Sequence, residues 1–135
     1  MRVMLDTNVL VSALLYPSAA MDQLLEVLDN DQLVLSDYVI DELMEVVQRK
    51  APTRLDGAHG LLRDLRFEII DDEAEGVAPT ALVDRDVNDV PVLLGAIAAD
   101  VDILVTGDKD FSELGLDRPL ILTPSQYVAF RTGQA

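Results

Sequence analysis

Short apolar segments rich in β-forming residues alternate along this chain with longer segments of helical periodicity. The strand-like segments are residues 2–6, 33–35, 67–70, 103–105 and 120–122. Between them, apolar residues recur at spacings of three and four, as they do through Met21, Leu24, Leu25 and Leu28. Such alternation is typical of a parallel sheet that is covered by helices on both faces. We therefore predict an α/β fold, a three-layer α/β/α sandwich around a central, mainly parallel, twisted sheet.

Local signals place the helices. We expect one near Val9, one that Ser36 caps and that ends at Pro52, and one over 93–98 with Pro91 in its first turn. A short helix is expected around 61–65, and a C-terminal one opens at Thr123 and continues to residue 130. Residues 71–87 are acidic and aperiodic, which predicts a long loop of the kind that is often functional.

Length and composition narrow the class of protein. At 135 residues we expect a single domain, 1–135. The absence of cysteine excludes disulfides, thiol catalysis and thiolate metal sites, and a single histidine excludes a His-rich zinc site. No apolar run is long enough to span a membrane, and the first residues do not resemble a signal peptide, so we expect a cytoplasmic protein.

Acidic residues follow several of the predicted strands. Asp6 ends the first, residues 71–72 follow the third, and Asp108 and Asp110 follow the fourth. Ligands of open α/β sheets bind beyond the carboxyl ends of the strands, so these acids are candidates for one site. Clustered carboxylates repel one another unless they are protonated or bridged by a cation, and oxygen-only ligands favour Mg²⁺ or Mn²⁺. Alternatively, Asp6 caps a helix, and the residues around Gly107 form a polar turn.

Spacing leaves the roles of three further acids open. At about 100° per residue, Glu42 lies close to the apolar arc of its helix, whereas Asp41 and Glu45 lie well away from it. Glu42 is therefore either a site residue or a boundary glutamate whose stem is partly buried. Asp86 and Asp89 precede the next apolar helix, and either one is placed to cap it or to reach the strand ends.

Four segments, in order along the chain, resemble the motifs of PIN-domain ribonucleases. They are residues 5–13 (LDTNVLVSA), residues 41–43 (DEL), residues 86–89 (DVND) and residues 104–111 (LVTGDKDF). The first and last are specific, and the middle two are acids in permissive contexts. The nearest subgroup is that of the VapC-like toxins of bacterial toxin–antitoxin pairs.

This resemblance implies an endoribonuclease that uses Mg²⁺ or Mn²⁺ to hydrolyse phosphodiester bonds of single-stranded or structured RNA. Carried over by position, the catalytic acids are Asp6, Glu42, Asp89 and Asp108, with Asp86 as the alternative third acid. Asp6, Asp89, Asp108 and Asp110 are the implied metal ligands, and Asn8 and Thr106 are polar supports. The resemblance also implies a protein antitoxin and a homodimer.

A formal charge of −15 opposes long-range attraction to RNA, so the placement of the basic residues matters. Half of the ten basic residues lie between positions 49 and 66, namely Arg49, Lys50, Arg54, Arg63 and Arg66. We expect a basic rim there, with Arg49 and Lys50 binding phosphate, or else a solvated surface that balances nearby acids. Tyr16 is the aromatic residue expected to contact a base, and His59 is expected at the surface.

Other functions remain open from sequence alone. A PIN nuclease that processes RNA or cleaves single-stranded DNA fits the same acids, because recognition of the 2′-hydroxyl depends on loop contacts. A catalytically silent module that binds a basic partner is a non-enzymatic alternative.

Overall fold

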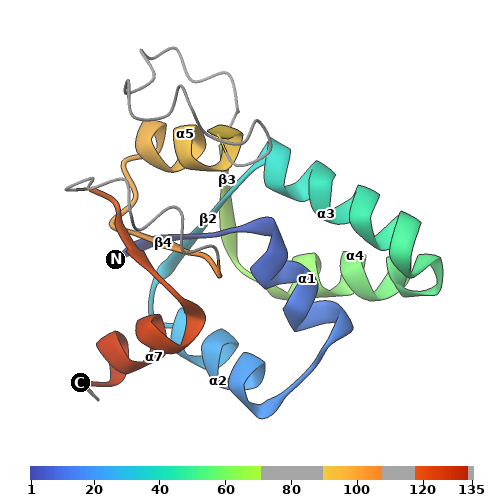
Figure 1. The fold of residues 1–135 in the computed structure, drawn as a ribbon, viewed down its shortest axis with the longest axis horizontal. Coiled ribbons are helices and arrows are strands. Elements are labelled where there is room, and N and C mark those ends of the chain that lie inside the picture. Colours follow the sequence, from blue (N-terminus) through green and yellow to red (C-terminus); the bar gives the residue numbers. More distant parts are fainter. Residues whose placement is uncertain (71–89, 108–117, 134–135) are drawn as a thin grey trace.

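The computed structural model describes residues 1–70, 90–107 and 118–133, and it places a five-stranded parallel sheet at the centre (Figure 1). The strand order is β3-β2-β1-β4-β5. The strands are β1 (Arg2–Leu5), β2 (Gln32–Ser36), β3 (Phe67–Ile70), β4 (Ile103–Val105) and β5 (Leu120–Leu122). All five strands predicted from the apolar segments are confirmed. The central pair β1 and β4 is in register from Val3 opposite Ile103 to Leu5 opposite Val105.

Helices flank this sheet and confirm the predicted three-layer α/β/α class. Helix α5 lies on the opposite side of the sheet from α1 and α4, while α2 and α7 lie side by side (Figure 1). The helices are α1 (Thr7–Leu15), α2 (Ala19–Leu28), α3 (Asp37–Lys50), the 3₁₀ turn η1 (Pro52–Arg54), α4 (Leu55–Asp64), α5 (Val90–Ala98) and α7 (Pro124–Thr132).

The helix expected around 61–65 begins earlier than predicted, at Leu55. Its first turns carry two glycines, Gly57 and Gly60, which weaken the helical signal there. The acidic loop predicted over 71–87 lies outside the described residues.

The core fills the space between the sheet and these helices. Val3, Met4 and Leu5 on β1 are at most 1% exposed, because β1 is the middle strand. Helix α3 buries Val39 and Leu43 completely. The apolar arc predicted for this helix therefore faces the core, where α1 and α4 pack against α3.

A serine cap sets the direction of α3. Ser36 ends β2, and its hydroxyl accepts a hydrogen bond from the backbone N–H of Val39 at 3.2 Å. This confirms the predicted N-cap, which satisfies one of the open N–H groups of the first turn. Since β2 and α3 meet at this residue, α3 starts at the carboxyl edge of the sheet.

A buried ionic cluster joins the two chain ends at the opposite, amino-terminal edge. Asp31, whose side chain has no exposed surface, accepts hydrogen bonds from Arg131 on α7 at 2.8 and 2.9 Å. It also lies 3.2 Å from the N-terminal ammonium of Met1 and accepts a short hydrogen bond from the Tyr127 hydroxyl. Burial, reinforced by this bond, raises the pKa of Tyr127 well above its usual value. The cluster therefore holds α7 against the turn between α2 and β2.

We expect Asp31→Asn to lower the free energy of unfolding by about 3 kcal/mol, because it leaves the Arg131 guanidinium partly buried without its counter-ion. The measurement is urea denaturation of the variant and of Asp29→Asn. Asp29 is an exposed acid two residues away, and its substitution is expected to leave stability within about 0.5 kcal/mol of wild type. Equal stability of the two variants would contradict a stabilising role for the cluster.

Candidate functional site

Buried polar residues gather at one edge of the sheet. Apart from Asp31 and Tyr127 in the cluster at the amino-terminal edge, the buried polar or charged residues in the described part of the chain are Asp6, Thr7, Ser36 and Thr106. All four lie at or just beyond the carboxyl ends of β1, β2 and β4. Burying polar groups is costly unless they are hydrogen-bonded or bind a ligand. This edge is therefore the part of the fold to search for a function.

The order in which the chain adds strands to the sheet reverses between β1 and β4. From β1 it proceeds to β2 and β3 on one side, and then returns to β4 on the other side. Ligands of open α/β sheets bind in the crevice at such a switch point. Asp6 directly follows β1 and Thr106 directly follows β4, so both residues lie at this point.

Asp6 is held by its neighbours in the sheet and does not cap a helix with its side chain. The residue is 6% exposed, and its carboxylate accepts a hydrogen bond from the Thr106 hydroxyl at 2.9 Å. Its backbone N–H donates to the carbonyl of Val105 at 2.9 Å. Although Asp6 is the N-cap residue of α1, its side chain accepts no capping hydrogen bond there. The alternative reading of Asp6 as a helix cap is therefore not supported.

Thr106 is fixed in the same way. Its backbone N–H donates to the carbonyl of Leu122 on β5 at 2.9 Å, and its side chain is buried. A residue that is anchored on both sides in this way has little freedom to rotate. The hydroxyl of Thr106 thus fixes the orientation of the Asp6 carboxylate.

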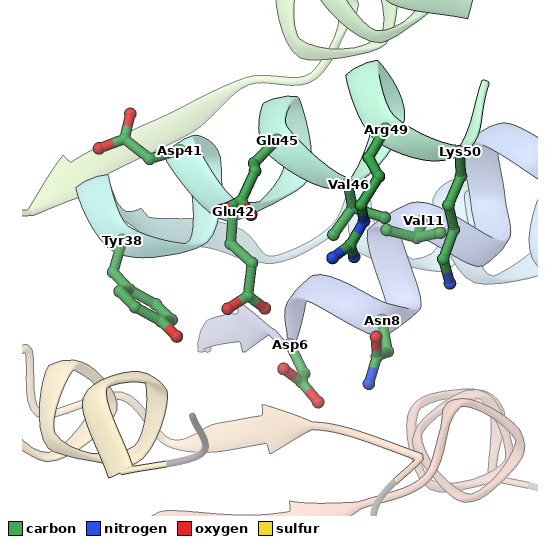
Figure 2. A pocket seen from close by; sticks show the side chains of 10 residues that line it. All are labelled: Asp6, Asn8, Val11, Tyr38, Asp41, Glu42, Glu45, Val46, Arg49 and Lys50. Carbon is green, nitrogen blue, oxygen red and sulfur yellow. The ribbon is translucent and has the colours of Figure 1, made fainter. Parts of the chain in front are cut away.

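A pocket of about 510 Å³ opens beside Asp6, between α1 and α3 (Figure 2). The half-buried Glu42 extends from α3 with its carboxylate toward Asp6, whereas Asp41 points away from Asp6 (Figure 2). The lining residues are Asp6, Asn8, Val11, Tyr38, Asp41, Glu42, Glu45, Val46, Arg49 and Lys50. Glu42 is therefore the acid of α3 that faces Asp6, as its position near the apolar arc predicted.

The far end of the pocket carries the opposite charge. Arg49 and Lys50, in the last turn of α3, extend to the same side of the helix as Glu42, and Asn8 of α1 lies opposite them (Figure 2). The pocket thus has a carboxylate centre and a cationic end. This distribution suits a ligand that brings both a bound cation and negatively charged groups.

The structure separates the sequence-predicted site residues into three groups. Asp6, Asn8, Glu42, Arg49 and Lys50 line the pocket, and Thr106 contacts Asp6. Tyr16 is the C-cap residue of α1; it is 69% exposed and does not line this pocket. Four further predicted acids lie outside the described residues: Asp86, Asp89, Asp108 and Asp110.

The five basic residues expected to form one rim lie in different places: Arg49 and Lys50 line the pocket, and the other three do not. Arg54, Arg63 and Arg66 are exposed and do not line this pocket. Arg66 lines a different pocket, with Asp29 and Gln32 near the amino-terminal edge of the sheet. Only the pair at the end of α3 is close to the acids.

Sequence reasoning missed Tyr38, which lines the pocket and is half-buried. A signal was present, because Tyr38 lies four residues before Glu42 and therefore on the same face of the helix. Once Glu42 is a candidate, Tyr38 is the aromatic residue that shares its face.

The carboxylate oxygens of Asp6 and Glu42 are ligands of the type that hard divalent cations prefer. Asp6 and Glu42 supply carboxylates to the pocket. The hydroxyl of Thr7, the next residue after Asp6, is buried without a hydrogen-bond partner but does not line the pocket. Buried hydroxyls are normally hydrogen-bonded, so polar capacity is left unused here. Among residues 1–70, 90–107 and 118–133, no three His, Cys, Asp or Glu side chains form a group that could hold a metal. The described residues alone therefore form no complete metal-binding group.

Comparison with known proteins agrees with this geometry. Residues 2–110 match the model of the PIN domain family, and the chain belongs to that family. Among solved structures, it is similar to a chain of VapBC2 from Rickettsia felis, crystallised with a DNA fragment from the promoter. The two share 28% sequence identity with a TM-score of 0.72, over 90% of this chain and 97% of the other. No curated protein matches the chain.

These findings confirm the resemblance to VapC-like PIN domains that the four motifs predict. Family membership also supports the coarser functional prediction, a nuclease. Within the described ranges, no helix combines the length and the apolar character needed to cross a bilayer.

We expect Thr106→Val, which keeps the shape of the side chain but removes its hydrogen bond to Asp6, to lower Mn²⁺ affinity about ten-fold. Groups that orient a metal ligand typically contribute this much. Calorimetric titration with Mn²⁺ measures the effect, and Thr106→Ser is the matched control that keeps the hydroxyl. Wild-type affinity in the valine variant would show that this hydroxyl does not orient a metal ligand.

Proposed function

We propose that the protein is a metal-dependent endoribonuclease of the VapC-like kind, which hydrolyses phosphodiester bonds of RNA in the pocket between α1 and α3. The observation that carries the proposal is the buried Asp6 carboxylate, held by Thr106 at the switch point of the sheet and facing Glu42. A buried, oriented carboxylate that faces a second one is costly for an apoprotein. A bound divalent cation offsets that cost.

The cation in this proposal is Mg²⁺ or Mn²⁺, held by Asp6 with Asp89, Asp108 and Asp110, and Asp86 is the alternative to Asp89. Such an ion lowers the pKa of a bound water and offsets negative charge on the phosphate. The four acids other than Asp6 in this set are proposed from the sequence, by their positions next to predicted strands and helices and by the motif match. Cysteine and histidine are absent from the set, which favours these hard ions over zinc.

The residues of the chain have separate tasks in this mechanism. Thr106 keeps the Asp6 carboxylate in one orientation by donating its hydroxyl hydrogen. The Glu42 carboxylate, at the edge of the pocket, accepts a proton from the attacking water. Asn8, whose side chain faces the pocket, orients polar groups of the substrate. No histidine is needed as a general base, and His59 is exposed on α4.

A protein antitoxin is the proposed partner, in a type II toxin–antitoxin pair. The similar chain of VapBC2 belongs to a complex, which supports a partner for this protein. A chain with a formal charge of −15 and acids at its site attracts basic side chains of such a partner. We also propose that the protein forms a homodimer.

Asp6→Asn is expected to abolish detectable binding of Mn²⁺ and Mg²⁺ and cleavage of single-stranded RNA, because it removes the central charged ligand. The fold is expected to persist, with equal or higher stability without metal, since repulsion with Glu42 is relieved. Calorimetry, an RNA cleavage assay and thermal unfolding on the same samples measure these effects. Asp56→Asn removes an equal charge from an exposed residue of α4 that does not line the pocket, and its activity should stay near wild type.

Two outcomes would refute the nuclease assignment at this site. One is full cleavage activity in Asp6→Asn. The other is a folded wild-type protein that binds neither ion, which would favour a module that binds a basic partner. Cleavage of single-stranded DNA but not of RNA would refute RNA as the substrate but would support the assignment of the active site.

The double variant Arg49→Ala/Lys50→Ala is expected to weaken RNA binding and to reduce its dependence on salt. Removing contacts to phosphate lowers the slope of log affinity against log salt by about one unit. Fluorescence anisotropy of labelled RNA between low and moderate salt measures the slope. Arg63→Ala/Arg66→Ala is the matched control, because it removes the same charge from exposed residues outside the pocket. Equal slopes in the two double variants would remove Arg49 and Lys50 from the RNA site.

A further inference from the structure

One face of α3 presents three different chemical groups to the pocket in a row. Tyr38, Glu42 and Arg49 are separated by four and seven residues, which places them on one stripe of the helix. With a rise of 1.5 Å per residue, Tyr38 lies about 6 Å before Glu42 and Arg49 lies about 10 Å beyond it. The stripe therefore carries an aromatic ring, a carboxylate and a guanidinium in that order.

Tyr38 lies at the end of the pocket away from the cations. Its ring reaches toward the pocket from the first turn of α3, on the other side of Glu42 from Arg49 and Lys50 (Figure 2). The ring is half-buried, so part of its surface is accessible. Phosphate is unfavourable at this end because, among the described residues that line the pocket, the charged groups near Tyr38 are the carboxylates of Asp41, Glu42 and Asp6. An uncharged aromatic surface here suits an uncharged, planar partner.

We propose that Tyr38 is a stacking platform for a nucleobase, and that a single-stranded RNA lies along α3 from Tyr38 to Arg49. The base of one nucleotide rests on Tyr38, the backbone passes the acids, and a neighbouring phosphate contacts Arg49 and Lys50. Aromatic rings stack on bases of any sequence, because every base has a π face. This inference rests on the proposed function and adds the direction and the contacts of the strand.

The aromatic contact expected from the sequence is thereby moved from Tyr16 to Tyr38. Tyr16 lies at the end of α1, beyond the lining of the pocket, and is 69% exposed. A base that stacks on Tyr38 is one helical turn from Glu42, so it fixes the backbone beside the acids. Tyr38 is therefore a positioning residue.

The test is RNA binding by variants at position 38, measured by fluorescence anisotropy in EDTA so that no cleavage takes place. Tyr38→Ala is expected to lose affinity for a labelled single-stranded RNA about ten-fold, the size of one lost stacking contact. Tyr38→Phe keeps the ring and is expected to bind as wild type. Tyr38→Leu keeps apolar volume without a ring, so it remains informative if the alanine variant folds poorly. Tyr16→Ala is the matched control and is expected to bind as wild type.

A series of RNAs that each lack one base separates stacking from a structural role of Tyr38. At one position, removal of the base is expected to weaken wild-type binding as much as Tyr38→Ala does. In the Tyr38→Ala protein, the same abasic RNA is expected to bind no more weakly than the intact RNA. If Tyr38 has only a structural role, removing a base should weaken RNA binding by the same factor in the wild-type and Tyr38→Ala proteins, whichever base is removed.

Several results would overturn the inference. Wild-type affinity in Tyr38→Leu, or fully additive losses at all abasic positions, would exclude stacking. Binding of a basic peptide that depends on Tyr38, without RNA binding, would assign this end of the pocket to a protein partner. Failure of the wild-type protein to bind RNA both in EDTA and with Mg²⁺ or Mn²⁺ present would refute both the inference and the proposed function. Binding that depends on Tyr38, without cleavage in Mg²⁺ or Mn²⁺, would support the inference and refute the nuclease.

Discussion

The hydrogen bond from Thr106 to Asp6 links the ends of β1 and β4, the neighbouring strands between which the strand order of the sheet reverses. It brings together two residues one hundred positions apart, because β1 and β4 are neighbours only in the folded sheet. The backbone bonds from Asp6 to Val105 and from Thr106 to Leu122 extend the sheet by one residue on each strand. A buried carboxylate is thus held rigidly at the mouth of a pocket, and the proposed chemistry depends on that rigidity.

The charge distribution resolves an apparent conflict between a very acidic chain and an RNA substrate. The net charge of −15 repels RNA at long range, but local charges decide binding once the strand is close. Along α3, the carboxylate of Glu42 and the cations at the C-terminal end are on one face of one helix. The cations also interact favourably with the helix dipole there. A bound divalent ion and this cationic end together offset the repulsion where the strand would lie.

Much of the sheet and part of the site were predictable from local sequence. The five strands follow from short apolar segments, and Asp6 follows from the rule that sites lie beyond strand ends, whereas the supporting role of Thr106 comes from the family resemblance. The position of Glu42 follows from helical periodicity, which is also local. By contrast, whether Tyr16 or Tyr38 lines the pocket depends on how α1 and α3 pack together. The division of the basic residues depends in the same way on where α4 lies. The pairing of Asp31 with Arg131, one hundred residues away, could not be predicted because no local sequence pattern connects the two residues.

The two edges of the sheet have different energetic roles. At the amino-terminal edge, Asp31 is paired with Arg131, Met1 and Tyr127, so its burial is compensated within the protein. At the carboxyl edge, the Asp6 carboxylate accepts a hydrogen bond from Thr106, but the Glu42 carboxylate extends toward it and the two like charges repel. The buried Thr7 hydroxyl has no hydrogen-bond partner, which also costs stability. A marginally stable domain tolerates such a cost only when other contacts offset it. The stabilising cluster around Asp31 lies at the far edge of the sheet. The positions of the acids at the carboxyl edge can therefore serve ligand binding, even where they lower the stability of the fold.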